Sequence, residues 1–299
     1  MKRIVTLFCF MTILILTGFK WKKASIADLE SGDRVILVSS SVEDWPAISP
    51  RNETVAFVSQ QDGVNSLKSI NLLAVELKKR GKELYFSKNL KGLDPQSEVF
   101  KTLYTNVDTS FYHPEYSPKG SKILCLSKSA SFEGKPFFFN KKHNKAIFLN
   151  YENVYTATWK SDEEIIFCQS SDSSSIYTYN LTTNDTVLFK RFDKKIKHIN
   201  KQKSSLLIGF TNRLESYSLY LKYNGGYPIR YSYDKAYLMD ELNLITTSSK
   251  DESILIDFNN NIVTPLVKGS KDINPVLSYD LRYVVVYSKS LKGIVLRVM

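Results

Sequence analysis

The feature that most constrains the fold of this chain is an internal repeat. Each copy has a short apolar segment, a turn and a run of β-forming residues, as at 45–59, 113–127 and 274–288. The large apolar residue before each turn serves as the reference position, and successive references are 68, 43, 40, 39 and 39 residues apart. A period of roughly 40 residues is typical of β-propellers, in which every blade is a four-stranded sheet. The six reference residues are Ile48, Tyr116, Trp159, Ile199, Leu238 and Leu277.

The spacing predicts an all-β fold, a six-bladed β-propeller with four-stranded antiparallel blades over residues 28–299. The longer first spacing predicts an insertion at about residues 73–111. Within it, residues 72–80 are expected to form either a short helix or a lengthened hairpin through Gly81.

Local patterns within the copies support the same interpretation. Residues 117–120 read Ser-Pro-Lys-Gly, which suits a type I turn because proline pre-sets the second position and glycine follows it. Residues 165–168 are an uninterrupted apolar run, as expected of a strand covered on both faces. Residues 182–185, 224–226 and 259–261 are polar and rich in Asn, Asp or Gly, so we predict hairpin turns there.

The two ends of the repeat region are expected to pair. The last copy has a predicted third strand at about residues 293–298 and no fourth, whereas residues 34–38 form a β-run outside every copy. An unpaired outer strand exposes backbone hydrogen-bonding groups, and closure removes that edge. We therefore predict that this N-terminal strand closes the last blade.

The first 27 residues look like a targeting segment. Lys2 and Arg3 precede residues 4–19, which carry no charge, as in the positive and apolar regions of a secretory signal. The apolar run is shorter than the roughly 20 residues of a membrane span. Residues 1–27 are thus expected to be either a cleaved signal peptide or an uncleaved N-terminal anchor, and the protein to be exported to the periplasm, the cell surface or the medium.

The charge of the chain does not indicate a nucleic-acid partner. The formal net charge is +11, but residues 1–27 hold five basic residues and no acid, so the rest carries only +6. The remaining lysines are scattered among acidic residues instead of forming the basic stripe that nucleic-acid binding requires.

Two cysteines occupy equivalent positions in neighbouring copies. Cys125 and Cys168 each lie nine residues after their reference residue. Equivalent positions in packed sheets are about 10 Å apart, whereas a disulfide needs Cα atoms within about 7 Å. The sequence predicts two free, buried thiols.

Known catalytic and metal-binding motifs are missing from the sequence. There is no Gly-x-Ser-x-Gly, His-Glu-x-x-His or Cys-x-x-Cys motif and no glycine-rich phosphate loop. His113 and His198 are both expected near the centre of the ring, but no clear third ligand accompanies them. We therefore predict no metal and no cofactor.

The repeat resembles that of the TolB-like six-bladed propeller family. Residues 116–120, Tyr-Ser-Pro-Lys-Gly, and residues 277–280, Leu-Ser-Tyr-Asp, are similar to its signature, with Lys119 where the family usually has Asp. The resemblance implies a six-bladed ring over roughly residues 33–299. It implies several roles, because such domains occur in periplasmic interaction proteins, in prolyl-oligopeptidase-like enzymes and in polysaccharide lyases.

The segments that lead into the inner strands converge at one mouth of the predicted ring. Aromatic and polar side chains mixed there would suit a peptide or glycan ligand. The same aromatic residues could instead pack between blades. The candidate ligand-binding residues are Asp44, Trp45, Tyr112, His113, Tyr155, Lys195, Lys235 and Asn274.

The sequence favours a non-catalytic, monomeric propeller that binds a protein or peptide partner at this mouth. The alternative is a propeller enzyme, a polysaccharide lyase or hydrolase, with His113 and either Asp44 or Lys235 supplying a base. An anchored sensor domain is a third hypothesis, in which membrane contact is made only through the N-terminal segment.

Overall fold

The computed structural model describes most of the repeat region as β-structure. The described residues are 34–36, 42–71, 79–80, 83–84, 100–229, 233–240, 243–248, 252–260, 262–266, 272–281, 283–288 and 293–298. All regular elements in these ranges are β-strands. Among them there is no apolar helix of membrane-spanning length. The predicted signal peptide at residues 1–27 lies outside these ranges.

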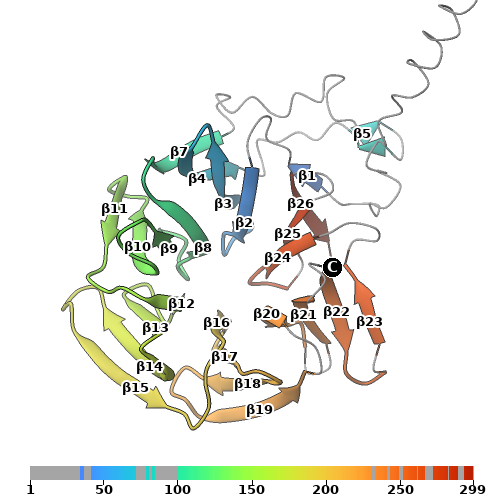
Figure 1. Ribbon diagram of the computed structural model, residues 1–299. Helices are drawn as coiled ribbons and strands as arrows, with labels where there is room; N and C mark the ends of the chain where they lie inside the picture. Colours follow the sequence, from blue (N-terminus) through green and yellow to red (C-terminus); the bar gives the residue numbers. More distant parts are fainter. Residues whose placement is uncertain are drawn as a thin grey trace, which may run out of the picture.

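The strands form four-stranded antiparallel sheets arranged around an axis, which is a β-propeller (Figure 1). One inner strand from each sheet faces the axis and contacts the inner strands of both neighbouring sheets. Written from inner to outer strand, sheet 1 is β2 (Val42–Ile48), β3 (Thr54–Gln61), β4 (Val64–Asn71) and β7 (Phe100–Asn106), and sheet 2 is β8 (Ser110–Tyr116), β9 (Lys122–Lys128), β10 (Lys135–Asn140) and β11 (Lys145–Phe148). Sheet 3 is β12 (Val154–Trp159), β13 (Glu164–Gln169), β14 (Asp172–Asn180) and β15 (Thr186–Arg191), and sheet 4 is β16 (His198–Gln202), β17 (Ser205–Gly209), β18 (Arg213–Ser218) and β19 (Tyr223–Pro228). Sheet 5 is β20 (Tyr233–Leu238), β21 (Asn243–Ser248), β22 (Ser253–Asp257) and β23 (Ile262–Pro265), and sheet 6 is β24 (Asp272–Leu277), β25 (Tyr283–Ser288), β26 (Gly293–Val298) and β1 (Arg34–Ile36).

Sheet 6 joins the two ends of the described chain. Strand β1 pairs antiparallel with β26, so that Arg34 lies opposite Leu296 and Ile36 opposite Ile294. Ile294 and Leu296 are buried in one cluster with Ile48 of sheet 1, which seals the seam between the last sheet and the first. The predicted pairing of the N-terminal strand with the last copy is confirmed, over residues 34–36.

The second strand of each sheet is buried because its two faces meet different neighbours. In β13, Ile165 and Phe167 belong to one buried cluster with Leu124 of sheet 2. Ile166, which points to the opposite face, belongs to another with Leu206 of sheet 4. Side chains alternate along a strand, so a strand between two sheets needs apolar residues at every position, as the sequence pattern indicated.

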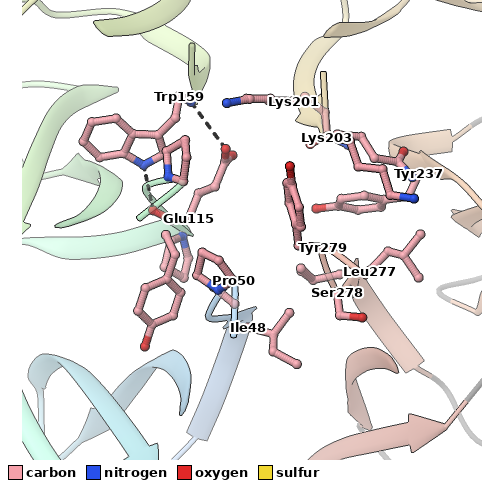
Figure 2. Close-up of a pocket in the computed structure, with 17 residues that line it drawn as sticks. Ile48, Pro50, Glu115, Trp159, Lys201, Lys203, Tyr237, Leu277, Ser278 and Tyr279 are labelled. Carbon is pink, nitrogen blue, oxygen red and sulfur yellow. Dashed lines mark hydrogen bonds between the residues drawn. The ribbon is translucent and has the colours of Figure 1, made fainter. Parts of the chain in front are cut away.

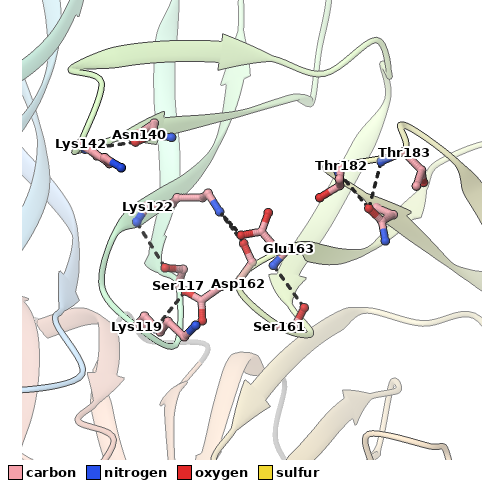
Figure 3. Close-up of polar contacts among 11 residues, drawn as sticks. Ser117, Lys119, Lys122, Asn140, Lys142, Ser161, Asp162, Glu163, Thr182 and Thr183 are labelled. Atoms are coloured by element: carbon pink, nitrogen blue, oxygen red, sulfur yellow. Dashed lines mark hydrogen bonds and ion pairs between the residues drawn. The ribbon is translucent and has the colours of Figure 1, made fainter.

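The turns after the inner strands repeat one hydrogen-bonding pattern. The Gly120 amide donates to the Ser117 carbonyl at 2.7 Å, and Gly120 has a φ of +73°. The Ser117 hydroxyl accepts a hydrogen bond from the Lys122 amide at 3.2 Å (Figure 3). Ser278 does the same for the Tyr283 amide at 2.9 Å. The serine in the repeat therefore caps the start of the second strand.

One predicted hairpin turn is wrong. Residues 224–226 lie inside β19, and the chain reverses earlier, where the Leu221 amide donates to the Ser218 carbonyl at 2.9 Å. Gly226 does not form a turn; it lets the Arg213 side chain lie close to the backbone of β19. A Cβ on Gly226 would lie 2.4 Å from Nη2 of Arg213, whose guanidinium covers this part of the outer strand.

Within the predicted insertion at residues 73–111, the structure describes a two-stranded hairpin. Its strands are β5 (Lys79–Arg80) and β6 (Glu83–Leu84), which pair antiparallel on either side of Gly81. Strand β7 then completes sheet 1, and β8 begins sheet 2 at Ser110.

Both predicted thiols are free and buried. Cys125 belongs to the cluster between sheets 1 and 2, and Cys168 to the cluster between sheets 3 and 4. Burial raises the pKa of the Cys125 thiol well above its ordinary value. Burial likewise raises the pKa of Cys168 to about 12, so both sulfurs stay protonated at neutral pH.

Candidate functional site

Three inner strands carry the same unusual backbone feature at equivalent positions. Trp45, His113 and Asn274 each precede a proline and have φ values of 51°, 53° and 55°. The strand register shifts at each of these positions. A positive φ is rare for large side chains, and strained or bulged positions are enriched at functional sites because they redirect a side chain.

These dipeptides meet between β2, β8 and β24. They surround a small hollow of about 20 Å³. The Trp45 and His113 ring centroids are 4.1 Å apart with an interplanar angle of 43°, so the two rings are in direct contact. Tyr112 lies behind this pair, 6.4 Å from Trp45 and 5.4 Å from His113.

A larger hollow of about 580 Å³ opens beside the Trp45–His113 pair. We call it the Trp45 hollow. It lies at the beginning of the inner strands, and its walls come from sheets 1, 2, 3 and 4. The residues that line it are Trp45, His113, Tyr155, Thr156, Ala157, Ser170, Ser173, Lys195, Ile196, Lys197 and His198.

One wall of the Trp45 hollow is a short segment held by its backbone. The Ile196 amide donates to the Ser173 carbonyl at 2.8 Å, and the Lys197 amide donates to the Gly209 carbonyl at 2.7 Å. The Tyr155 hydroxyl donates to the Ile196 carbonyl at 2.9 Å. Ile196 is fully buried, whereas the lysines on either side of it are exposed. The segment therefore presents two exposed cationic side chains from a fixed backbone.

His198 is the first residue of β16 and is only 7% exposed. Its imidazole occupies the space over Gly209, the residue opposite it in the sheet. A Cβ on Gly209 would lie 2.1 Å from Cε1 of this ring. The glycine is thus required for the imidazole to reach the wall of the hollow.

Tyr155 and Tyr112 are uncharged at physiological pH. Burial raises the pKa of Tyr155 far above its ordinary value, and the nearby Cys168 and Asp172 act in the same direction. Burial, followed by the negative charge of Glu133, raises the pKa of Tyr112 to about 12. Neither phenol is therefore suited to act as a base near neutral pH.

A second hollow, of about 100 Å³, lies at the other end of the inner strands (Figure 2). We call it the Glu115 hollow. Figure 2 shows the Glu115 carboxylate directed inward, with Lys201 and Tyr279 also placed around the space. One oxygen of Glu115 accepts hydrogen bonds from the Thr158 hydroxyl at 2.6 Å and from the Trp159 amide at 3.3 Å.

Lys201 connects sheet 4 to sheet 3 through two hydrogen bonds. Its amide donates to the Thr158 hydroxyl at 3.0 Å, and its Nζ donates to the Lys160 carbonyl at 3.0 Å. Burial lowers the pKa of the Lys201 ammonium, and the negative charges of Glu115 and Asp162 oppose that shift. The side chains that line the Glu115 hollow thus also join neighbouring sheets.

The predicted site residues divide into three groups. The structure brings Trp45, His113, Tyr155 and Lys195 together around the Trp45 hollow, and Asn274 joins Trp45 and His113 at the small hollow. Tyr112 packs in the cluster between sheets 2 and 3. Asp44 and Lys235 belong to β2 and β20, and their side chains lie outside the described residues.

Sequence reasoning missed Glu115 and Gly209 as residues that organise the two ends. The signal for Glu115 was present, because it and Thr158 both immediately precede a reference residue and are polar within apolar inner strands. In the part of the chain that the structure describes, no group of three or more His, Cys, Asp or Glu side chains could hold a metal ion.

Comparisons with known proteins bear on the fold alone. No protein-family model and no curated protein sequence matches this chain. A chain of the mitotic checkpoint complex is similar in structure, with a TM-score of 0.57 and 9% identity over 89% of this chain and 95% of that chain. A chain of the nidogen/laminin complex has a TM-score of 0.52 and 10% identity over 75% and 79% of the two chains. An oligogalacturonate lyase in complex with manganese has a TM-score of 0.49 and 11% identity over 85% and 76%.

Proposed function

We propose that this protein is an exported, TolB-like six-bladed β-propeller that binds a protein or peptide partner in the Trp45 hollow without catalysing a reaction. The observation that carries the proposal is the hollow itself. Its volume of about 580 Å³ falls within the range of ligand-binding sites, and it combines aromatic walls with exposed polar groups.

The backbone around the hollow supports a binding role. Three large or polar residues are held at positive φ on equivalent positions of neighbouring strands, and two of them, Trp45 and His113, form one wall. Such strain is retained where the surrounding structure gains from placing a side chain. An aromatic residue in a rigid frame loses little conformational entropy on binding, which favours it as an anchor.

The structural neighbours and the sequence provide weaker support. Two of the neighbours come from structures of protein complexes, which agrees with a protein partner in general terms. The uncharged run at residues 4–19 after Lys2 and Arg3 supports export.

The test is to isolate a partner with the immobilised full chain, identify and purify it, and measure its Kd. Trp45→Asn removes the indole and keeps a residue that tolerates positive φ, as Asn274 does at the equivalent position. We expect this change to weaken binding by about tenfold or more, the loss typical of an aromatic anchor. Tyr220→Asn is the control, because Tyr220 is 92% exposed in the turn between β18 and β19.

Equal affinity of the Trp45→Asn variant and the original chain would place the partner elsewhere and overturn the proposal. Turnover of a saccharide or tight stoichiometric metal binding by the purified full chain would favour an enzyme instead. Fusion of residues 1–27 to a reporter that is active only outside the cytoplasm tests export, and an inactive reporter would contradict it.

A further inference from the structure

The charged side chains that line the Trp45 hollow share one sign. They are Lys195 and Lys197, which are both exposed. The described lining includes no Asp or Glu. The formal charge contributed by the described lining is therefore positive.

The nearby carboxylate of Asp172 is already occupied by other groups. It accepts hydrogen bonds from the Ser174 hydroxyl at 3.1 Å and the Tyr177 hydroxyl at 3.1 Å, and it forms an ion pair with Arg191 at 3.2 Å. These bonds, with that of Ser175 as the largest cause, hold the pKa of Asp172 below its ordinary value. Asp172 therefore remains an anion that is neutralised locally by Arg191.

Lys195 and Lys197 come from one segment whose backbone is held in place. Residues 195–197 are fixed by the backbone hydrogen bonds to Ser173 and Gly209, and buried Ile196 holds the segment in place. A fixed backbone reduces the entropy lost when a side chain engages a ligand. An ammonium group paired with a carboxylate forms a charge-assisted hydrogen bond, which is stronger than a neutral one.

We propose that the Trp45 hollow recognises a carboxylate of its peptide ligand, with Lys195 and Lys197 binding the charged group and the Trp45–His113 pair contacting an adjacent apolar side chain. This inference rests on the proposed function, because it takes the occupant to be a peptide. The carboxylate can come from an Asp or Glu side chain or from a peptide C-terminus. The two sources share the same chemistry, and the experiment separates them.

The experiment uses the full chain and four five-residue peptides of defined sequence, with affinity measured by calorimetry and by tryptophan fluorescence. The first is N-acetylated and C-amidated Gly-Glu-Phe-Glu-Gly. The second replaces both Glu with Gln, the third has the Gln sequence with a free C-terminal carboxylate, and the fourth replaces both Glu with Lys. We expect the first or the third to bind at least about tenfold more tightly than the second, and the fourth to bind most weakly.

Two lysine variants locate the site. The double change Lys195→Gln and Lys197→Gln should weaken binding of the carboxylate peptide by about tenfold or more, and should remove most of its dependence on salt concentration. The matched control is Lys194→Gln, because Lys194 is an exposed neighbour that does not line the hollow. It should change the affinity by less than about twofold. Thermal melting and circular dichroism of each variant establish that it is folded.

The outcomes separate the two proposals. Equal binding of the first, second and third peptides, or tightest binding of the Lys peptide, would overturn carboxylate recognition while leaving peptide binding in place. Undiminished binding of the acidic peptide to the double lysine variant would also overturn it. If none of the four peptides binds, carboxylate recognition fails, and the proposed function is then decided separately by the partner affinity of the Trp45→Asn variant.

Discussion

The two ends of the inner strands differ in the size of the hollow between the sheets. At the Glu115 end, side chains connect neighbouring sheets through Glu115, Thr158 and Lys201, and the remaining hollow is about 100 Å³. At the Trp45 end the hollow is about 580 Å³, and its wall includes residues with positive φ. Side-chain hydrogen bonds of Tyr155 and Thr156 join sheets 3 and 4 at the Trp45 end too, so cross-sheet bonding does not by itself exclude a large hollow.

Figure 3 shows further side-chain contacts between neighbouring sheets, in the turns that follow the inner strands. Lys122 Nζ donates to the Asp162 carbonyl at 2.7 Å and pairs with Glu163 at 2.8 Å, and the Lys119 amide donates to Asp162 at 3.0 Å. These contacts connect the turn of sheet 2 to that of sheet 3. Asn52 and Asp280 connect sheets 1 and 6 in a similar way, at 2.9 Å.

The largest expected effect comes from breaking the ring on which both ends depend. Deletion of residues 28–40 removes β1 and leaves β26 with an unpaired edge. We expect the melting temperature to fall by about 10 °C or more, because several kcal/mol of pairing and packing are lost. Deletion of residues 2–27 is the control and should leave the melting temperature unchanged. An unchanged value for the longer deletion would disprove a closing role for β1.

A change at the Glu115 end should affect stability and spare binding. Glu115→Ala leaves the Thr158 hydroxyl and the Trp159 amide without their shared acceptor, at a cost of about 2 kcal/mol in unfolding free energy. Glu115→Gln keeps an acceptor and should cost less than about 1 kcal/mol. Denaturant unfolding measures both. A large loss of peptide affinity in either variant would show that the two ends are not independent.

A change at the Trp45 end should affect both properties, because Gly209 supports a wall of the hollow. Gly209→Ala places a methyl group where the His198 imidazole lies, so the ring must move. We expect a loss of about 1–2 kcal/mol in unfolding free energy, as for other overpacked sites. Peptide affinity should fall as well. Retained stability and affinity would show that the imidazole can shift without consequence.

The smallest expected effect concerns the two buried thiols, Cys125 and Cys168, which lie in the cores between sheets and not at either hollow. Their pKa values are raised in the folded state, so folding keeps them protonated. The stability that they contribute is complete below the ordinary thiol pKa of 9.0 and is lost as pH rises toward about 12, the value for Cys168. Alkylation of the native protein at pH 8 should therefore be slow, and denaturant should accelerate it. Rapid labelling of the native chain would contradict this interpretation.

Much of the fold could be predicted because its signals are local and repeated. Tyr116, Trp159 and Leu277 end their inner strands as the spacing indicated, and the apolar run at residues 165–168 is buried on both faces. The turn assigned to residues 224–226 failed because glycine serves turns and close approach equally well. Only the position of the Arg213 guanidinium distinguishes the two.

The candidate site could be predicted only in part. Trp45, His113, Tyr155 and Lys195 were assigned to one mouth because they precede equivalent strands, and the hollow brings them together. Tyr112 comes from the same pattern but packs between sheets, because adjacent residues of a strand point to opposite faces.

The amino-acid sequence was enough to predict the approximate period of the repeat, the buried faces of the second strands, the pairing of the N-terminal strand and five of the six residues that end the inner strands. The sixth, Ile199, was wrong, because it is the second residue of β16 (His198–Gln202). The others follow from hydrophobic patterning and turn chemistry, which act over a few residues. How large a hollow each end contains was settled only by the packing of the sheets. The contact between Trp45 and His113, and that between Glu115 and Thr158, join residues on different sheets, and their distances depend on how the sheets pack.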